Sequence, residues 1–69
     1  MESHIDGAFT GWYGGAVFKL RNGQIWRQEG FSYRYRYAYM PRVTISPIAE
    51  GHVLRVEGMG EGVSVRRLR

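Results

Sequence analysis

The sequence has no cysteine and, among its 69 residues, only two prolines and six acidic residues. Without cysteine, disulfides and thiolate metal sites are excluded, and these are two of the devices that usually stabilise a small domain. No apolar run approaches the roughly 20 residues of a membrane-spanning helix. The segment from Met1 to His4 lacks the basic and apolar parts of a signal peptide. We therefore expect a cytoplasmic protein that has no membrane partner.

Hydrophobic residues make up 43% of the chain and charged residues 23%, which is typical of a folded globular domain. We expect one domain over residues 1–69. A domain of this size buries only about 60% of the surface that its unfolded chain exposes, so its stability is marginal. Since disulfides and thiolate metal sites are excluded, oligomerisation is the remaining means of stabilisation, and self-association is favoured.

Basic residues outnumber acidic ones by ten to six, which gives a net charge of +4. All of the basic residues except Lys19 are arginines, and arginine suits bidentate contacts with phosphate or carboxylate and stacking on rings. The charge favours acidic partners, although solubility alone would also explain it.

Ten glycines divide the chain into segments that are too short for helices. No window repeats apolar residues at intervals of three and four over more than one turn, so little or no helix is expected. The pattern predicts an all-β fold, a small and partly open SH3-like barrel of about five to seven antiparallel strands. An OB-like barrel is the alternative.

Asn22 and Gly23 tolerate positive φ and predict a hairpin. Two registers are open, and we favour a three-residue loop, 21–23, which places Phe18 opposite Trp26. Alternation predicts inward side chains in the later strands at Val43, Ile45, Leu54, Val56, Val63 and Val65. Weaker signals predict a strand at 5–9 and a mobile hairpin tip at 58–62.

The strongest single pattern lies in residues 31–40, which Pro41 ends. Alternation places five rings on one face of a strand: Phe31, Tyr33, Tyr35, Tyr37 and Tyr39. The opposite face carries Arg34 and Arg36. Because two buried charges without an acidic neighbour in the sequence would be costly, we expect the tyrosines to point inward and the arginines outward.

Ten extended residues span about 33 Å, whereas a compact chain of this length is only about 28 Å across. The end rings should therefore lie at a rim or against another molecule. Three interpretations stay open for the rings: core packing, pairing of the strand with a second copy of itself, and stacking of nucleic-acid bases. For the third, the candidate phosphate contacts are Arg34, Arg36, Arg42, Arg66 and Arg67.

No arrangement of serine, histidine and carboxylate suggests a nucleophile, so we do not expect an enzyme. The two histidines, His4 and His52, are interpreted as solvated turn residues and not as metal ligands. No metal site and no cofactor are predicted. The expected function is a binding module that associates with itself or with another protein, with single-stranded nucleic acid as the alternative ligand.

The run Asn22, Gly23, Gln24, Ile25, Trp26, with Gly11 and Trp12 before it and Pro41, Arg42, Val43 and Ile45 after it, resembles a group of small uncharacterised bacterial proteins. The resemblance covers most of the chain. It implies an SH3-like fold in proteins that occur alone, as tails of other proteins or on mobile gene cassettes, and it implies no known activity.

Val43, Ile45 and Pro47 also resemble a short strand of the plasmid-borne type II dihydrofolate reductases. That family consists of small barrels that assemble around a shared pore, and this resemblance implies an oligomeric pore enzyme as a remote alternative. Thr44 and Ser46 stand where the family has glutamine and tyrosine, so its activity is not carried over to this chain.

Overall fold

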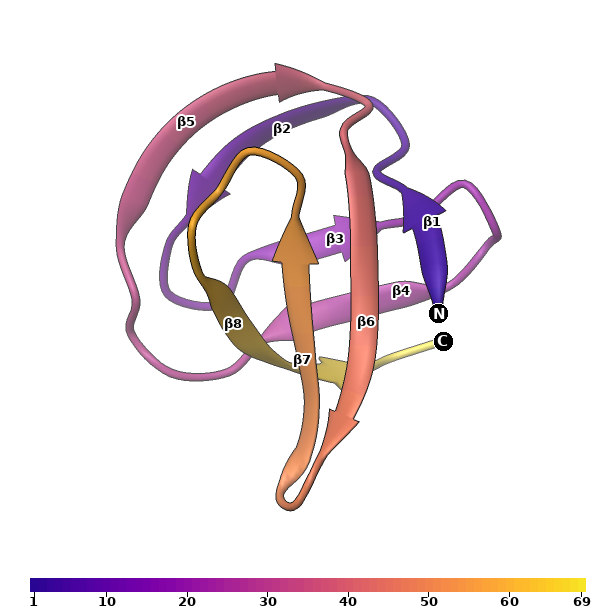
Figure 1. Cartoon of the computed structure of the whole chain (residues 1–69), viewed down its shortest axis with the longest axis vertical. Helices are drawn as coiled ribbons and strands as arrows, with labels where there is room; N and C mark the ends of the chain where they lie inside the picture. Colours follow the sequence, from indigo (N-terminus) through magenta and orange to yellow (C-terminus); the bar gives the residue numbers. More distant parts are fainter.

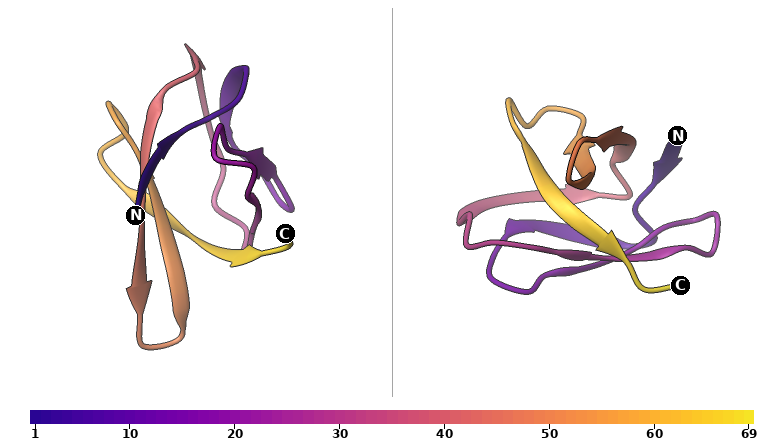
Figure 2. Two further views of the ribbon diagram at one scale, coloured as in Figure 1. Left: turned by 90° about the vertical axis from the view of Figure 1, so that its right-hand side faces the viewer. Right: turned by 90° about the horizontal axis from the view of Figure 1, so that it is seen from below.

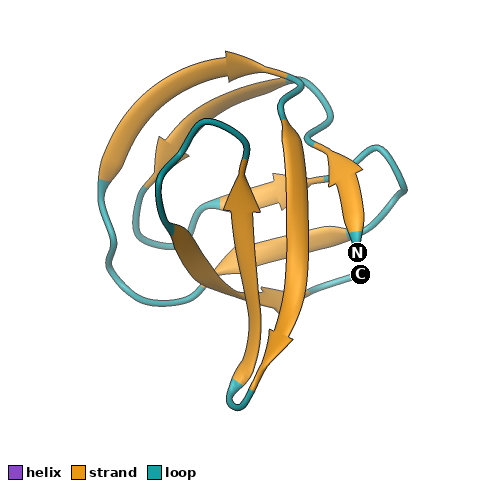
Figure 3. Cartoon of the chain, in the orientation of Figure 1, coloured by secondary structure: helices purple, strands orange, loops and turns teal.

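The computed structural model describes the whole chain, residues 1–69, as eight short strands without a helix (Figures 1 and 3). The strands are β1 (Glu2–His4), β2 (Ala8–Trp12), β3 (Val17–Lys19), β4 (Ile25–Gln28), β5 (Arg34–Tyr39), β6 (Arg42–Ile48), β7 (Gly51–Val56) and β8 (Gly62–Arg67). Six strands form one sheet in the order β1-β6-β7-β8-β4-β3, and β2 pairs with β5 in a second sheet. Every pairing is antiparallel. The expected small, all-β and partly open barrel is confirmed, although it has eight strands where about five to seven were expected.

The six-stranded sheet curls until its two edges meet (Figure 2). Just beyond β1 and β3, Ile5 forms a bridge with Leu20. Beside this bridge, the Asp6 N–H donates to the carbonyl of Lys19 at 2.7 Å. Contact between the edges at this single bridge leaves the barrel only partly closed.

The two sheets are joined by sharp bends. The chain turns at Gly7, between β1 and β2, where φ is +99°, and at Met40, between β5 and β6, where φ is +49°. At the joint the Met40 N–H donates to the carbonyl of Gly7 at 2.8 Å. The predicted strand at 5–9 is therefore wrong in its bounds, because the bend at Gly7 ends the extended segment before Ala8.

Fourteen buried hydrophobic residues form one core cluster: Ile5, Phe9, Trp12, Ala16, Phe18, Leu20, Trp26, Val43, Ile45, Leu54, Val56, Met59, Val63 and Val65. Three aromatic rings pack edge to face at its centre. The ring centroid of Trp12 lies 5.4 Å from that of Phe9 and 5.8 Å from that of Phe18. The predicted inward residues of the strands at 42–47, 52–57 and 63–65 are all in this core, so those predictions are confirmed.

The favoured hairpin register is also confirmed. Phe18 pairs with Trp26 and Lys19 with Ile25. The Gly23 N–H donates to the carbonyl of Leu20 at 3.0 Å, which closes the three-residue loop. Ala16, Phe18, Leu20 and Trp26 are buried, while Val17 on the other face is 47% exposed.

Gly11 explains how two residues three positions apart in β2, Phe9 and Trp12, both reach the core. In a regular strand such residues point to opposite faces. The pairing of β2 with β5 shifts its register between Phe9 and Gly11, and Gly11 has a φ of +108°. This left-handed conformation is readily adopted only by glycine, and it turns the chain so that Trp12 faces inward.

The segment from Gly58 to Gly62 connects the paired strands β7 and β8, as the predicted hairpin tip should, but one of its side chains is buried. Met59 belongs to the core and is only 8% exposed. The Met59 N–H donates to the carbonyl of Val56 at 2.9 Å, which starts the turn after β7. Glycines on both sides of a buried methionine allow this loop between β7 and β8 to fold back over the end of the barrel.

Met59→Ala tests this burial. We expect the free energy of unfolding to fall by about 2 kcal/mol or more, because a buried methionine side chain is replaced by a partial cavity. Urea unfolding followed by tryptophan fluorescence measures the change. The matched control is Ile48→Ala, since Ile48 is 45% exposed in β6; a loss no larger for Met59→Ala than for this control would show that the loop does not pack on the core.

No helix in the structure has the length and apolar character that crossing a membrane requires.

Candidate interaction site

Three tyrosines of β5 form an exposed row on the outer side of the β2 and β5 pair. Tyr35 is 78% exposed, Tyr37 59% and Tyr39 69%. We call these three residues the tyrosine face. Tyr33 and Phe31 lie in the preceding loop, outside the strand, and are 81% and 93% exposed. The predicted ten-residue strand is thus shortened to six residues, and none of its rings is in the core.

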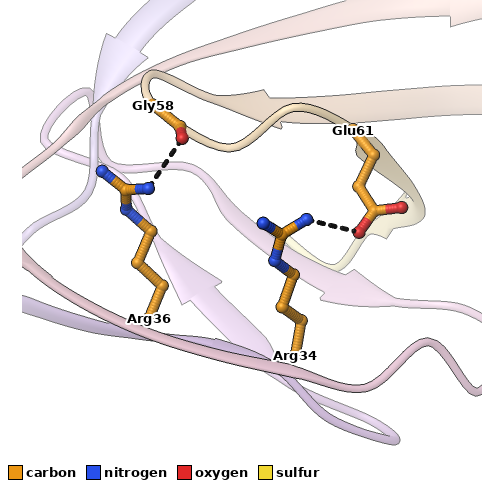
Figure 4. A network of polar contacts seen from close by, with 4 residues as sticks. All are labelled: Arg34, Arg36, Gly58 and Glu61. Carbon is orange, nitrogen blue, oxygen red and sulfur yellow. Dashed lines mark hydrogen bonds and ion pairs between the residues drawn. The ribbon is translucent and has the colours of Figure 1, made fainter.

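The predicted orientation of this strand is wrong. Arg34 and Arg36 lie on the side that faces the loop between β7 and β8 (Figure 4). Arg34 Nη1 is 3.1 Å from Glu61 Oε1, and Arg36 Nη1 donates to the carbonyl of Gly58 at 2.8 Å. The acidic partner of Arg34 is not a neighbour in the sequence. Glu61 lies 27 positions away and meets Arg34 only through the fold.

These arginines are not buried, so pointing inward costs them little. The side chains of Arg34 and Glu61 are 49% and 58% exposed, and an ion pair this exposed contributes at most about 1 kcal/mol. The second reason for the reversal is the core itself. Phe9 and Trp12 of β2, with Phe18 of β3, already fill the space beneath β5, and only Ala38 of that strand packs against them.

Neither the tyrosine hydroxyls nor one backbone edge of β5 is paired within the protein. No hydrogen bond of the structure involves the phenol groups of Tyr33, Tyr35, Tyr37 or Tyr39. Exposed phenols can be hydrated or can pair with another molecule. β5 has β2 as its only neighbouring strand, so one edge of its backbone carries no ladder.

The five arginines predicted to contact phosphate do not form one track. Arg34 and Arg36 are engaged by the loop between β7 and β8, as described above. Arg42 lies 3.5 Å from Glu2 of the adjacent strand β1. Arg66 and Arg67 lie in β8, opposite Arg27 and Trp26 of β4. The cations are therefore dispersed over several faces, and none of the engaged guanidiniums projects beside the tyrosine face.

Sequence reasoning missed Gln28, the only polar residue among the buried ones, at 2% exposed. Its Oε1 accepts from the Tyr13 N–H at 3.2 Å, and its Nε2 donates to the carbonyl of Ser32 at 3.0 Å. The signal was present in the sequence, because Gln28 stands two positions after the inward Trp26. A buried amide must satisfy its donors and acceptors, and here it does so by joining two loops.

No group of three histidine, cysteine, aspartate or glutamate side chains is placed so that it could hold a metal ion. His52 contacts Trp26 instead, with ring centroids 5.1 Å apart.

No protein-family model matches this chain, and the searches of curated proteins and of solved structures return no match. The resemblance to the small bacterial barrel proteins stays a prediction.

Proposed function

We propose that this protein is a non-catalytic, cytoplasmic interaction module that associates with a second copy of itself through the tyrosine face. One observation carries the proposal: three neighbouring tyrosines of β5 are between 59% and 78% exposed. Tyrosine is enriched at protein interfaces because it combines a large apolar ring with a polar tip.

The area of the tyrosine face supports a specific contact. At their observed exposure, three tyrosines offer on the order of 300 to 500 Å². A stable interface of ordinary size buries roughly 800 Å² on each partner. The rings alone therefore supply about half of such an interface, and the exposed Ala8 and Thr10 of the paired strand β2 extend it.

Charge favours a second copy over nucleic acid as the partner of this face. The chain carries a net charge of +4, so two copies repel each other, and they do so least when they meet through an uncharged surface. The outward side chains of β5 are all tyrosines, and Arg34 and Arg36 are held on the other side. A nucleic acid would need cations next to the stacked bases, and the tyrosine face provides none from β5.

The same charges favour packing of ring against ring over pairing at the strand edge. Edge pairing of β5 with its copy would extend one sheet and would bring Arg34 and Arg36 of both copies onto a shared face. Like charges opposite each other in neighbouring strands are destabilising. Packing the tyrosine faces about a two-fold axis keeps the four guanidiniums apart and is self-complementary, as a symmetric dimer requires.

The double substitution of Tyr35→Ser with Tyr37→Ser tests the proposal. Light scattering across a dilution series should show the wild type as a dimer at high concentration and the double variant as a monomer. We expect the dimer dissociation constant to rise at least a hundredfold, since each central ring at an interface contributes about 1.4 kcal/mol or more.

The matched control is Val17→Ser, which removes an apolar side chain that is 47% exposed on β3. It should leave the dimer dissociation constant unchanged within about twofold. A wild-type protein that stays monomeric at the highest soluble concentration would refute the proposal. So would a dimer that the double tyrosine variant leaves intact.

A further inference from the structure

Two arginines stand directly opposite each other without a counterion. Arg27 of β4 pairs with Arg66 of β8, and both are exposed. The ion pairs of the structure join Arg34 to Glu61 and Arg42 to Glu2, so neither Arg27 nor Arg66 has an acidic partner. Like charges in directly opposed positions destabilise a sheet. This pair therefore costs stability that the fold itself does not recover.

The pair borders an open depression that also contains an exposed ring. Its lining comprises Gly15, Arg27, Gln28, Glu29, Gly30, Phe31 and Arg66. The Arg27 guanidinium lies over Gly15, because a Cβ atom added to this glycine would be 3.3 Å from Arg27 Nη2. The Phe31 ring lies over Gly14, where an added Cβ atom would be 4.0 Å from Phe31 Cδ1. Adjacent Cα atoms are about 3.8 Å apart, so the ring and the guanidinium flank one short turn.

The backbone beside the exposed ring is held in place. Phe31 is 93% exposed, yet the next residue, Ser32, accepts a hydrogen bond from the buried Gln28. The same amide accepts from Tyr13 on the other side of the glycine turn. Gln28 thus fixes the two loops that carry the ring and the turn. A loop whose backbone is already ordered loses less conformational freedom when it binds a ligand.

We propose that this depression binds single-stranded nucleic acid, with two backbone phosphates contacted by Arg27 and Arg66, one by each, and one base stacked on Phe31. Paired guanidiniums suit phosphate oxygens, and a ring beside a cationic groove is the arrangement that single-strand binders use. A simple anion would engage the arginines but would leave the ring unused. This site is separate from the tyrosine face and does not depend on self-association.

Fluorescence anisotropy with a labelled ten-nucleotide oligo-dT measures the wild-type affinity. Two phosphate contacts predict a slope of about −1.4 in log affinity against log salt, or roughly a sevenfold loss between 50 and 200 mM KCl. Arg27→Gln or Arg66→Gln should each weaken binding at 50 mM salt by about fivefold or more. Each should also reduce the slope to about −0.7, because one contact is lost.

Phe31→Ala should weaken binding about fivefold or more while leaving the salt slope unchanged, since stacking releases no counterions. Glu29→Gln removes the one carboxylate of the depression and should tighten binding about twofold. The matched control is Arg55→Gln, which makes the same charge change on β7, outside the depression. It should change the affinity less than twofold.

Failure of the wild type to bind at 50 mM salt would overturn the proposal. An effect of Arg55→Gln equal to that of Arg27→Gln would also overturn it, by showing that only net charge matters. Competition by inorganic phosphate or by an acidic peptide as strong as that by unlabelled oligo-dT would rule out nucleic acid as the ligand. Circular dichroism confirms that each variant is folded, and light scattering on the Phe31→Ala variant reports separately on self-association.

Discussion

Gly11→Ala is expected to remove most of the stability of the protein. A Cβ atom at position 11 would lie 2.0 Å from the carbonyl oxygen of Arg34 and 2.9 Å from the backbone nitrogen of Arg36. Both of these are backbone atoms of β5 and cannot move aside without breaking its pairing with β2. Since a strained backbone conformation costs about 1 to 3 kcal/mol by itself and the lost pairing adds to it, we expect a total of about 3 kcal/mol or more.

Thermal and urea unfolding followed by far-ultraviolet circular dichroism measure this loss. Gly7→Ala is the matched control, because Gly7 has a φ of +99° and nothing lies within 4 Å of its Cβ position. It should lose only the cost of the backbone conformation, about 1 to 3 kcal/mol, and less than Gly11→Ala. Equal and small losses for the two variants would show that β2 and β5 do not approach each other as closely as the structure has them.

Trp12→Ala should have an effect of similar size. Trp12 is 2% exposed and packs its ring against the edges of Phe9 and Phe18. Removing a buried tryptophan costs about 3 to 5 kcal/mol, and domains are stable by only about 5 to 15 kcal/mol, the smallest ones near the lower end. We expect the variant to be largely unfolded at 37 °C, as one-dimensional proton spectra would show by their loss of dispersion.

Trp12→Phe separates the ring packing from the polar group. The indole Nε1 of Trp12 is buried and makes no hydrogen bond, and an unsatisfied buried donor costs about 1 to 3 kcal/mol. Phenylalanine keeps an aromatic ring and removes this donor, so its variant should lose well under half of what Trp12→Ala loses. Equal losses of stability in the two variants would show that Trp12 does not stabilise the protein through the packing of its ring.

Much of the fold follows from local sequence rules. The alternation of Val43 with Ile45 and of Leu54 with Val56, together with the turn at Asn22 and Gly23, predicts the central hairpins and their inward faces, because in each case the period and the turn act within a few residues. These rules fail where the backbone departs from a regular strand. The bends at Gly7 and Gly11 interrupt the segment that contains β1 and β2, and they change which of its residues face inward.

The candidate site shows a different limit of sequence reasoning. Alternation correctly separates the tyrosines from Arg34 and Arg36, but it does not say which face is inside. That choice depends on Glu61 and the carbonyl of Gly58, which are remote in sequence, and on Phe9, Trp12 and Phe18, which fill the core first. The opposition of Arg27 to Arg66 follows from strand pairing, which the sequence does not reveal directly.

The two faces of β5 have separate tasks. Its inner side chains secure the strand to the remainder of the barrel, whereas Tyr35, Tyr37 and Tyr39 make no contribution to the core. Selection can therefore exchange the outer row for other residues without endangering folding. In that sense the barrel is a support whose outer residues can change while its architecture persists.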